Sequence, residues 1–116
     1  MNKEYIIKNQ NEIDALFGKK NKIANQYFNI LYQSNESHFR FAISVGKKYG
    51  NAVERNLIKR RIRHILHSIK EKILAFDFVV VCKANAKSLN YEEMSNTLKE
   101  LLLKANIMEE RNVQEI

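Results

Sequence analysis

The sequence predicts an α+β fold of one domain, in which helices pack on a small mixed sheet. Three observations lead to this prediction. Residues 39–45 alternate between apolar and polar side chains, which is typical of a strand with one covered face. Residues 76–82 are almost continuously apolar, as expected for a strand that is buried on both faces. Between them, apolar residues recur with the helical period and form one stripe: Ile58, Ile62, Ile65, Leu66, Ile69 and Ile73.

The first half of the chain is expected to contain one helix and two strands. A short helix over residues 12–17 would have Asn11 as its N-cap and would end at Gly18. A polar, basic loop over residues 21–25 and a strand over residues 27–32 follow. After a turn over residues 33–38, the alternating strand places Arg40, Ala42 and Ser44 outward, opposite Phe39, Phe41, Ile43 and Val45.

The second half is expected to contain a long helix over residues 52–75, the buried strand over residues 76–82 and a final helix. The final helix runs over residues 91–104 with Asn90 as its N-cap, and its apolar set is Met94, Leu98, Leu101, Leu102 and Ala105. The predicted order of elements is therefore α-β-β-α-β-α.

Length and composition limit the class of protein. A chain of 116 residues has room for one domain, over residues 1–116. It contains no proline and only three glycines, and it shows neither a linker nor an internal repeat. No apolar run is long enough to span a membrane, and the N-terminus lacks the apolar stretch of a secretory signal. The single cysteine, Cys82, is expected to be a small buried hydrophobic residue in a reduced, cytoplasmic protein.

The positive charge is concentrated in one segment. The net charge is +7, and residues 40–63 hold eight basic residues against one acid, Glu54. The rest of the chain holds equal numbers of basic and acidic residues. A helix face that is merely solvated usually mixes both signs, so this segment indicates a surface that binds a polyanion.

The basic segment has an internal order that suits a nucleic acid. Lys47 and Lys48 precede a helix N-terminus, whose free N–H groups favour phosphate. Asn56 suits a ribose hydroxyl, a base edge or a hydrated metal ion. Leu57 is expected at the back of the helix, near Arg61 and His64. The predicted RNA-contacting residues are Lys47, Lys48, Asn51, Arg55, Asn56, Lys59, Arg60, Arg61 and Arg63, of which Arg55, Lys59 and Arg63 form one i, i+4 row.

No catalytic or metal site is predicted in the protein itself. A nuclease site needs clustered carboxylates or a pair of histidines in acid–base roles. The acids are scattered along the chain, and His64 and His67 lack the further ligands of a zinc site. No glycine-rich phosphate loop occurs.

Residues 41–63 resemble the signature of the bacterial ribonuclease P protein component. That signature is a strand ending in Ser-Val-x-Lys-Lys, a Gly-Asn-Ala-Val turn and an Arg-Asn-Arg helix, and here these read Ser44–Lys48, Gly50–Val53 and Arg55-Asn56-Leu57. The likeness extends over nearly the whole chain, including residues 13–28, 77–83 and 88–93.

The resemblance implies a function and a fold. The chain would be the accessory protein subunit of an endoribonuclease that removes the 5′ leader of precursor tRNA, while the RNA subunit performs hydrolysis with Mg²⁺. No membrane and no obligate protein partner are implied. Arg55, Asn56, Lys59, Arg60 and Arg63 would contact the catalytic RNA, and a cleft between the first helix and the sheet would hold the leader. A left-handed β-α-β crossover, against the general right-handed rule, is also implied.

Two departures from the family pattern matter. Leu57 replaces the second arginine of the motif, and Arg61 is the nearest basic residue that could substitute for it. The family also tends to carry aromatic residues at the positions of Ile13 and Leu31, whereas Phe17 and Phe28 match. The leader cleft is therefore expected to use Ile13, Phe17, Tyr27 and Leu31, with core packing as the alternative for Phe17, Tyr27 and Phe28.

Two other functions stay open at this level. A structural or ribosomal RNA-binding protein could carry the same basic helix without a role in tRNA processing. A self-sufficient nuclease is disfavoured because the carboxylates are scattered.

Overall fold

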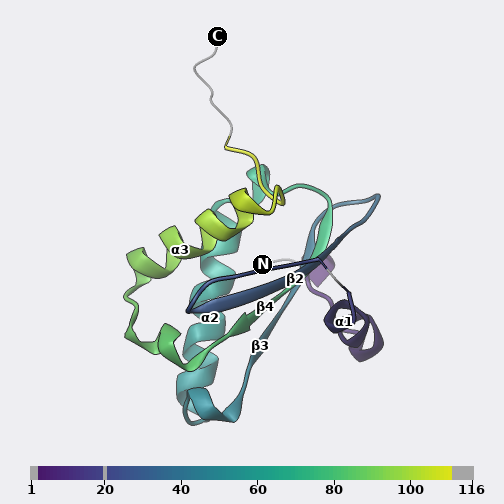
Figure 1. Cartoon of the computed structure of the whole chain (residues 1–116). Helices are drawn as coiled ribbons and strands as arrows, with labels where there is room; N and C mark the ends of the chain where they lie inside the picture. Colours follow the sequence, from purple (N-terminus) through teal and green to yellow (C-terminus); the bar gives the residue numbers. More distant parts are fainter. Residues whose placement is uncertain (1–2, 20, 111–116) are drawn as a thin grey trace.

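A four-stranded mixed sheet lies between two layers of helix in the computed structural model, which describes residues 3–19 and 21–110. The strand order is β1-β2-β4-β3. Helices α2 (Ala52–Ser68) and α3 (Tyr91–Lys104) cover one face, and the short helix α1 (Gln10–Phe17) lies at the other (Figure 1). The predicted α+β architecture is confirmed.

The central pair of strands is β2 (Phe28–Ser34) and β4 (Phe76–Cys82), which run antiparallel. Strand β3 (Arg40–Val45) pairs in parallel with β4 and forms one edge of the sheet. The β3–α2–β4 connection is therefore the parallel crossover that the family resemblance implies; its left-handed sense stays an expectation. Short 3₁₀ helices complete the path: η1 (Lys3–Tyr5), η2 (Lys47–Tyr49), η3 (Lys70–Lys72) and η4 (Ala84–Ser88).

The region between α1 and β2 differs from the prediction. Residues 21–25 were expected to be a loop, but Lys22–Ala24 form a third antiparallel strand, β1, at the other edge of the sheet. Its pairing with β2 stabilises a segment that has no strand signal of its own. Helix α1 also begins earlier than predicted. Its N-cap is Asn9, whose Oδ1 accepts the N–H of Asn11 at 2.8 Å, so Asn11 lies inside the helix.

Helix α2 ends at Ser68, seven residues before the predicted end. The apolar stripe continues through Ile69 and Ile73, and both side chains are buried. The backbone leaves the helix because the segment after α3 pairs with it: Leu74 N–H donates to Ile107 O at 2.7 Å, and Ile73 forms a bridge with Met108. A contact between distant parts of the chain thus overrides the local helical period.

Both long helices start at a complete capping box. Asn51 Oδ1 accepts the N–H of Glu54, whose carboxylate accepts the N–H of Asn51, each at 2.9 Å. Asn90 and Glu93 repeat the arrangement at α3, so the predicted N-cap and bounds of that helix are confirmed. Each box satisfies two N–H groups that a helix start leaves free.

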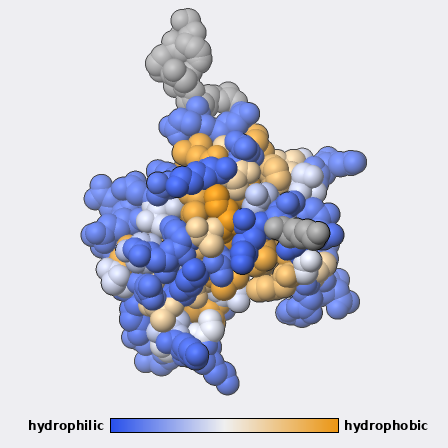
Figure 2. Space-filling model, in the orientation of Figure 1, coloured by the Kyte–Doolittle hydropathy of each residue, from blue (hydrophilic) through white to orange (hydrophobic). Residues whose placement is uncertain are grey.

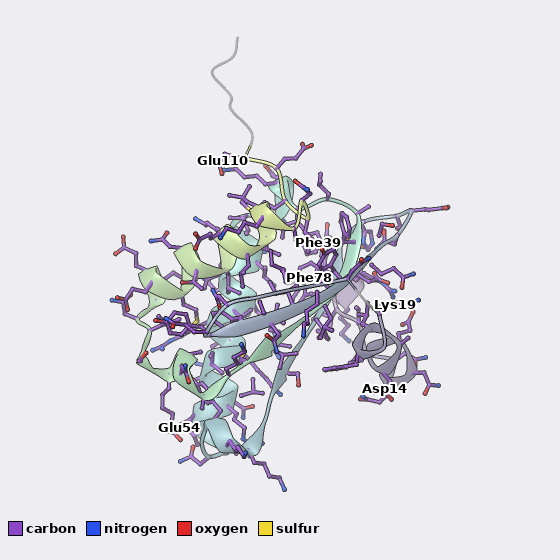
Figure 3. All side chains as sticks on the ribbon, viewed as in Figure 1. Asp14, Lys19, Phe39, Glu54, Phe78 and Glu110 are labelled. Carbon is purple, nitrogen blue, oxygen red and sulfur yellow. The ribbon has the colours of Figure 1, made fainter. Side chains whose placement is uncertain are left out.

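The main core lies between the sheet and helices α2 and α3. Phe39, Phe41 and Phe78 stack within it, and the ring centroids of Phe41 and Phe78 are 6.1 Å apart. Figure 3 labels Phe39 and Phe78 in this core. A smaller cluster on the α1 side joins Leu16 to buried sheet residues, and its members are Ile7, Leu16, Leu31 and Val79. In Figure 2, hydrophobic residues occupy the middle of the face shown and hydrophilic residues surround them.

Candidate nucleic-acid interface

The basic residues of α2 and the turn before it are available for a ligand. Within the described residues, none of the predicted RNA-contacting lysines and arginines forms a salt bridge. Lys47 and Lys48 are exposed on η2, directly before the N-terminus of α2. The side-chain oxygen of Asn51 already accepts a hydrogen bond as the N-cap of α2. The predicted lysine turn at a helix start is therefore present.

The row of Arg55, Lys59 and Arg63 borders the buried side of α2. Arg55 and Lys59 are partly buried, whereas Arg63, Asn56 and Arg60 are exposed. Arg55 Nε is buried and has no hydrogen-bond partner among the described residues. A buried donor without a partner typically costs about 1–3 kcal/mol, so the Arg55 side chain is held in this position at a cost in stability.

A groove runs along the outer edge of β3, and two adjoining cavities form it. The first, of about 270 Å³, is lined by Gln10, Ile13 and Phe17 of α1, by residues 42–45 of β3, by Val79 and by Lys59. The second, of about 180 Å³, includes Ile6, Ile7, Ile13, Phe41 and both Lys59 and Arg63. Because α1 and α2 lie on opposite faces of the sheet, this β3-edge groove must pass around the edge strand. It joins the basic row to α1.

The backbone of β3 is partly free along this groove. Ile7 N–H donates to Phe41 O at 2.9 Å, so the N-terminal segment pairs with the strand at that one position. Since successive residues of a strand point their backbone groups to opposite sides, Ile43 and Val45 present theirs to the same outer edge. Neither has a backbone partner there among the described residues. The groove therefore offers peptide donors and acceptors beside an aromatic ring and two cations.

The structure brings two of the four predicted leader-cleft residues into the groove. Ile13 and Phe17 line it, and Phe17 is 47% exposed. Leu31 is instead buried in the small cluster beneath Leu16. Tyr27 packs against the main core on the opposite face of the sheet, and Phe28 is fully buried in that core.

Tyr27 departs from the predicted strand alternation for a local reason. It lies in a bend before the first residue of β2. Asn25 Oδ1 accepts the N–H groups of both Tyr27 and Phe28 at 2.8 Å, which fixes the bend. The expectation that Tyr27 shares the strand face of Leu31 is therefore wrong.

Arg40, which contributes to the basic segment in the sequence, is neutralised in the fold. Its guanidinium bonds Asp77 of β4 and also reaches Glu12 of α1. These two carboxylates raise the pKa of Arg40 above its ordinary value, the hydrogen bond to Asp77 contributing most. The positive charge that faces a ligand thus comes from the basic residues of η2 and α2. Sequence composition could not have distinguished these residues from the paired Arg40.

The opposite flank of α2 carries Leu57, which is 39% exposed. As predicted from helix geometry, Leu57 and Arg61 are neighbours, since both line a separate pocket beside Tyr49 and Lys87. His64 accompanies them on this flank, where its Nδ1 lies 2.6 Å from the hydroxyl oxygen of Tyr91. Tyr49 of η2 and Lys87 of η4 were not predicted as site residues, because they meet α2 only in the folded chain.

Two features are absent from the part of the chain that the structure describes: a metal-binding group of side chains and a membrane-spanning helix. It contains no group of three or more His, Cys, Asp or Glu side chains that could hold a metal ion. None of its helices combines the length and the apolar composition needed to cross a membrane.

Comparison with known proteins identifies the family. The family model described as ribonuclease P matches residues 1–106. The ribonuclease P protein component of Phytoplasma australiense is 42% identical over 97% of this chain and 100% of its own length. That of Acholeplasma laidlawii is 40% identical over 94% of this chain and 96% of its own.

Solved structures agree. A Staphylococcus aureus RNase P protein mutant with defective mRNA degradation activity superposes with a TM-score of 0.87 at 37% identity, covering 91% of this chain and 92% of that one. The RNase P protein of Thermotoga maritima gives a TM-score of 0.78 at 26% identity, covering 84% and 94%. The chain therefore belongs to the ribonuclease P protein family.

Proposed function

We propose that this chain, as the protein subunit of ribonuclease P, binds the catalytic RNA through the exposed basic flank of α2 and holds the 5′ leader of precursor tRNA in the β3-edge groove. Family membership makes the chain part of an endoribonuclease complex and the ribonuclease P RNA its partner. The proposal that the RNA and the leader bind on adjoining surfaces rests on the position of Lys59. Lys59 belongs both to the basic row and to the wall of the groove.

The contact with the catalytic RNA is electrostatic in this proposal. Arg60 and Arg63 are exposed and can pair bidentately with phosphate oxygens. Lys47 and Lys48 add charge at the start of α2, where free N–H groups already attract phosphate. Asn56 adds a donor and an acceptor beside the row, for a ribose hydroxyl or a hydrated metal ion that the RNA holds.

The leader would lie in the groove as a single strand. Phe17 offers a half-exposed ring on which a base can stack, a contact that contributes about 1–3 kcal/mol per base. Lys59 and Arg63 stand at the other wall for the phosphates. The free peptide groups of Ile43 and Val45 can meet base edges between them. This division of roles places base contacts on α1 and β3 and backbone contacts on α2.

The chemistry of cleavage is assigned to the RNA subunit with Mg²⁺. The described residues contain no group of three or more His, Cys, Asp or Glu side chains that could hold a metal ion, in line with this assignment. We place the assembly in the cytoplasm, where precursor tRNA is made in bacteria. In this account, the protein increases affinity for the substrate and reduces the Mg²⁺ that the RNA needs by neutralising phosphates.

The test is cleavage of a precursor tRNA by a bacterial ribonuclease P RNA at low Mg²⁺, with and without the protein. The proposal predicts that the protein stimulates cleavage and that the protein alone cleaves nothing. If the protein bound the RNA without stimulating cleavage, a purely structural RNA-binding role would be supported instead. Cleavage by rigorously purified protein without RNA would indicate a self-sufficient nuclease.

A further inference from the structure

A third cavity lies on the flank of α2 that faces away from the β3-edge groove. This back pocket has a volume of about 130 Å³ and is lined by Tyr49, Glu54, Leu57, Ile58, Arg61 and Lys87. We infer that the back pocket is a second RNA site, which takes one nucleotide of the ribonuclease P RNA with its phosphate between Arg61 and Lys87. The inference rests on the proposed function, because it presumes that α2 docks on that RNA.

The back pocket is separate from the groove. Lys59 and Arg61 are two residues apart, so their side chains leave the helix axis about 200° apart. Lys59 lines the groove, and Arg61 lines the back pocket. The buried stripe of α2, which includes Ile58 and Ile62, lies between the two flanks. An RNA segment that lies in the groove on one flank therefore does not fill the back pocket on the other flank.

Charge in the back pocket favours an anion. Lys87 Nζ lies 3.3 Å from Glu54 Oε2, so the one carboxylate in the pocket is already paired. Arg61 is partly buried and forms no salt bridge within the described residues. The pocket thus carries one excess positive charge, held by a guanidinium whose planar shape matches two phosphate oxygens.

The remaining walls suit a base. Leu57 contributes an apolar surface that is 39% exposed. Tyr49 forms the buried floor of the pocket, with Lys87 Nζ over its ring at 5.4 Å from the centroid. An exposed apolar side chain beside two cations matches a nucleotide, which joins a flat apolar group to an anion. An acidic peptide would use the cations but would leave Leu57 unmatched.

A close approach of the backbone keeps the pocket in shape. At Gly50 a Cβ atom would overlap the Glu54 carboxylate and would lie 3.0 Å from Lys87 Nζ. The absence of a side chain there leaves room for Lys87 of η4 to reach the carboxylate of Glu54, which Figure 3 labels in the first turn of α2. Lys87 is therefore held in the pocket by its ion pair with Glu54 and by the packing of η4 on η2.

The first experiment compares Lys87→Ala and Arg61→Ala with Lys104→Ala, a control at the end of α3. The affinity of each protein for Staphylococcus aureus ribonuclease P RNA is measured over a range of salt concentrations, after thermal melts have checked folding. We expect each pocket variant to bind about threefold to tenfold more weakly and to lower the log–log salt slope by about 1, because one phosphate contact is lost. Lys104→Ala should bind like the wild type.

A second variant makes the test independent of any loss of folding. Glu54→Gln keeps the capping box, because glutamine also serves at its third position, but releases Lys87 from its carboxylate. We expect RNA binding to tighten by about twofold to fivefold, and by less in Glu71→Gln, which makes the same charge change beyond the other end of α2. Wild-type binding by Lys87→Ala and Arg61→Ala would overturn the inference. If Arg60→Ala and Arg63→Ala also bound like the wild type, the proposed function would fail with it.

Discussion

Arg40 of β3 forms a short ion pair with Asp77 of β4, the neighbouring strand, in which Arg40 Nη2 lies 2.7 Å from Asp77 Oδ2. The same Nη2 lies 3.2 Å from Glu12 Oε2, on the helix that carries Ile13 and Phe17. Asn35 Nδ2 completes the network by donating to Asp77 Oδ1 at 2.8 Å. One guanidinium thus fixes the wall of the β3-edge groove relative to the strand that it faces.

Loss of this link should loosen α1. Arg40→Ala removes hydrogen bonds between charged groups and leaves Asp77 partly buried, so we expect the free energy of unfolding to fall by about 1–3 kcal/mol. Urea denaturation measures the change. Glu12→Gln is the matched control: Glu12 is more exposed, and its pairing should contribute less than about 1 kcal/mol. Equal effects of the two variants would contradict the central role of Asp77.

The close packing at Gly50 gives a prediction about the start of α2. Gly50→Ala would push the Glu54 carboxylate away, because the added Cβ overlaps it. The capping box would then lose its reciprocal bond, and we expect about 0.5–2 kcal/mol of destabilisation. Thermal melts measure the loss. Gly46→Ala is the control, since nothing lies within 4 Å of a Cβ there, and a larger loss in Gly46→Ala would refute the explanation.

Cys82 gives a prediction about reactivity and pH. Burial raises the pKa of its thiol from 9.0 to about 12, and the side chain is 6% exposed. Because the thiolate is the reactive form, the native protein at about pH 8 should resist a disulfide reagent that labels the unfolded chain quickly.

The same shift sets the sign of the pH dependence. From about pH 9 upward the unfolded chain releases the thiol proton while the folded chain keeps it, so this term should lower stability as pH rises toward 12. Equilibrium denaturation of the wild type and Cys82→Ala at several pH values isolates the term. Fast, complete labelling of native protein, or an identical pH dependence in Cys82→Ala, would contradict the buried, neutral thiol.

Leu57 tests the flank where the family motif has an arginine. Its side chain is exposed beside Arg61, so Leu57→Arg should fold normally and add a cation to the back pocket. We expect equal or tighter binding to the catalytic RNA, up to about tenfold, with a steeper salt dependence. Leu57→Gln controls for loss of the apolar surface. Arginine keeps a planar surface for a base and adds a cation, so a clear loss of affinity in Leu57→Arg would contradict an anionic partner at this flank.

Much of the fold is predictable because its signals are local. The start of α3 follows from Asn90 and Glu93, which close a capping box within four residues. The buried strand β4 follows from its composition, and its observed bounds are those predicted. The end of α2 and strand β1 are not predictable in this way. The first depends on Met108 pairing with Ile73, and the second on β2 supplying a partner for Lys22–Ala24.

The candidate site, like the fold, is predictable from the sequence only where its signals are local. Helix geometry alone separates Arg55, Lys59 and Arg63 from Leu57, and the structure keeps them apart. The sequence pattern cannot show that Arg40 is paired with Asp77, because the two residues meet only when β3 and β4 align. Nor can alternation place Tyr27, since Asn25 bends the chain before β2 begins. The path of the groove around β3 depends on three elements at once.

The most direct test of the account measures how far the leader contributes to substrate affinity in the assembled holoenzyme. Phe17→Ala is the informative variant, because Phe17 is half exposed and can be removed without opening the core. Affinities for precursor tRNA with a long leader and for mature tRNA are measured with wild type, Phe17→Ala and Tyr27→Ala. We predict that Phe17→Ala loses about 1–3 kcal/mol of leader-dependent affinity while binding mature tRNA and the catalytic RNA normally. Tyr27→Ala, once corrected for folding, should keep the leader dependence. An unchanged dependence on the leader in Phe17→Ala would contradict the placement of the leader in the β3-edge groove.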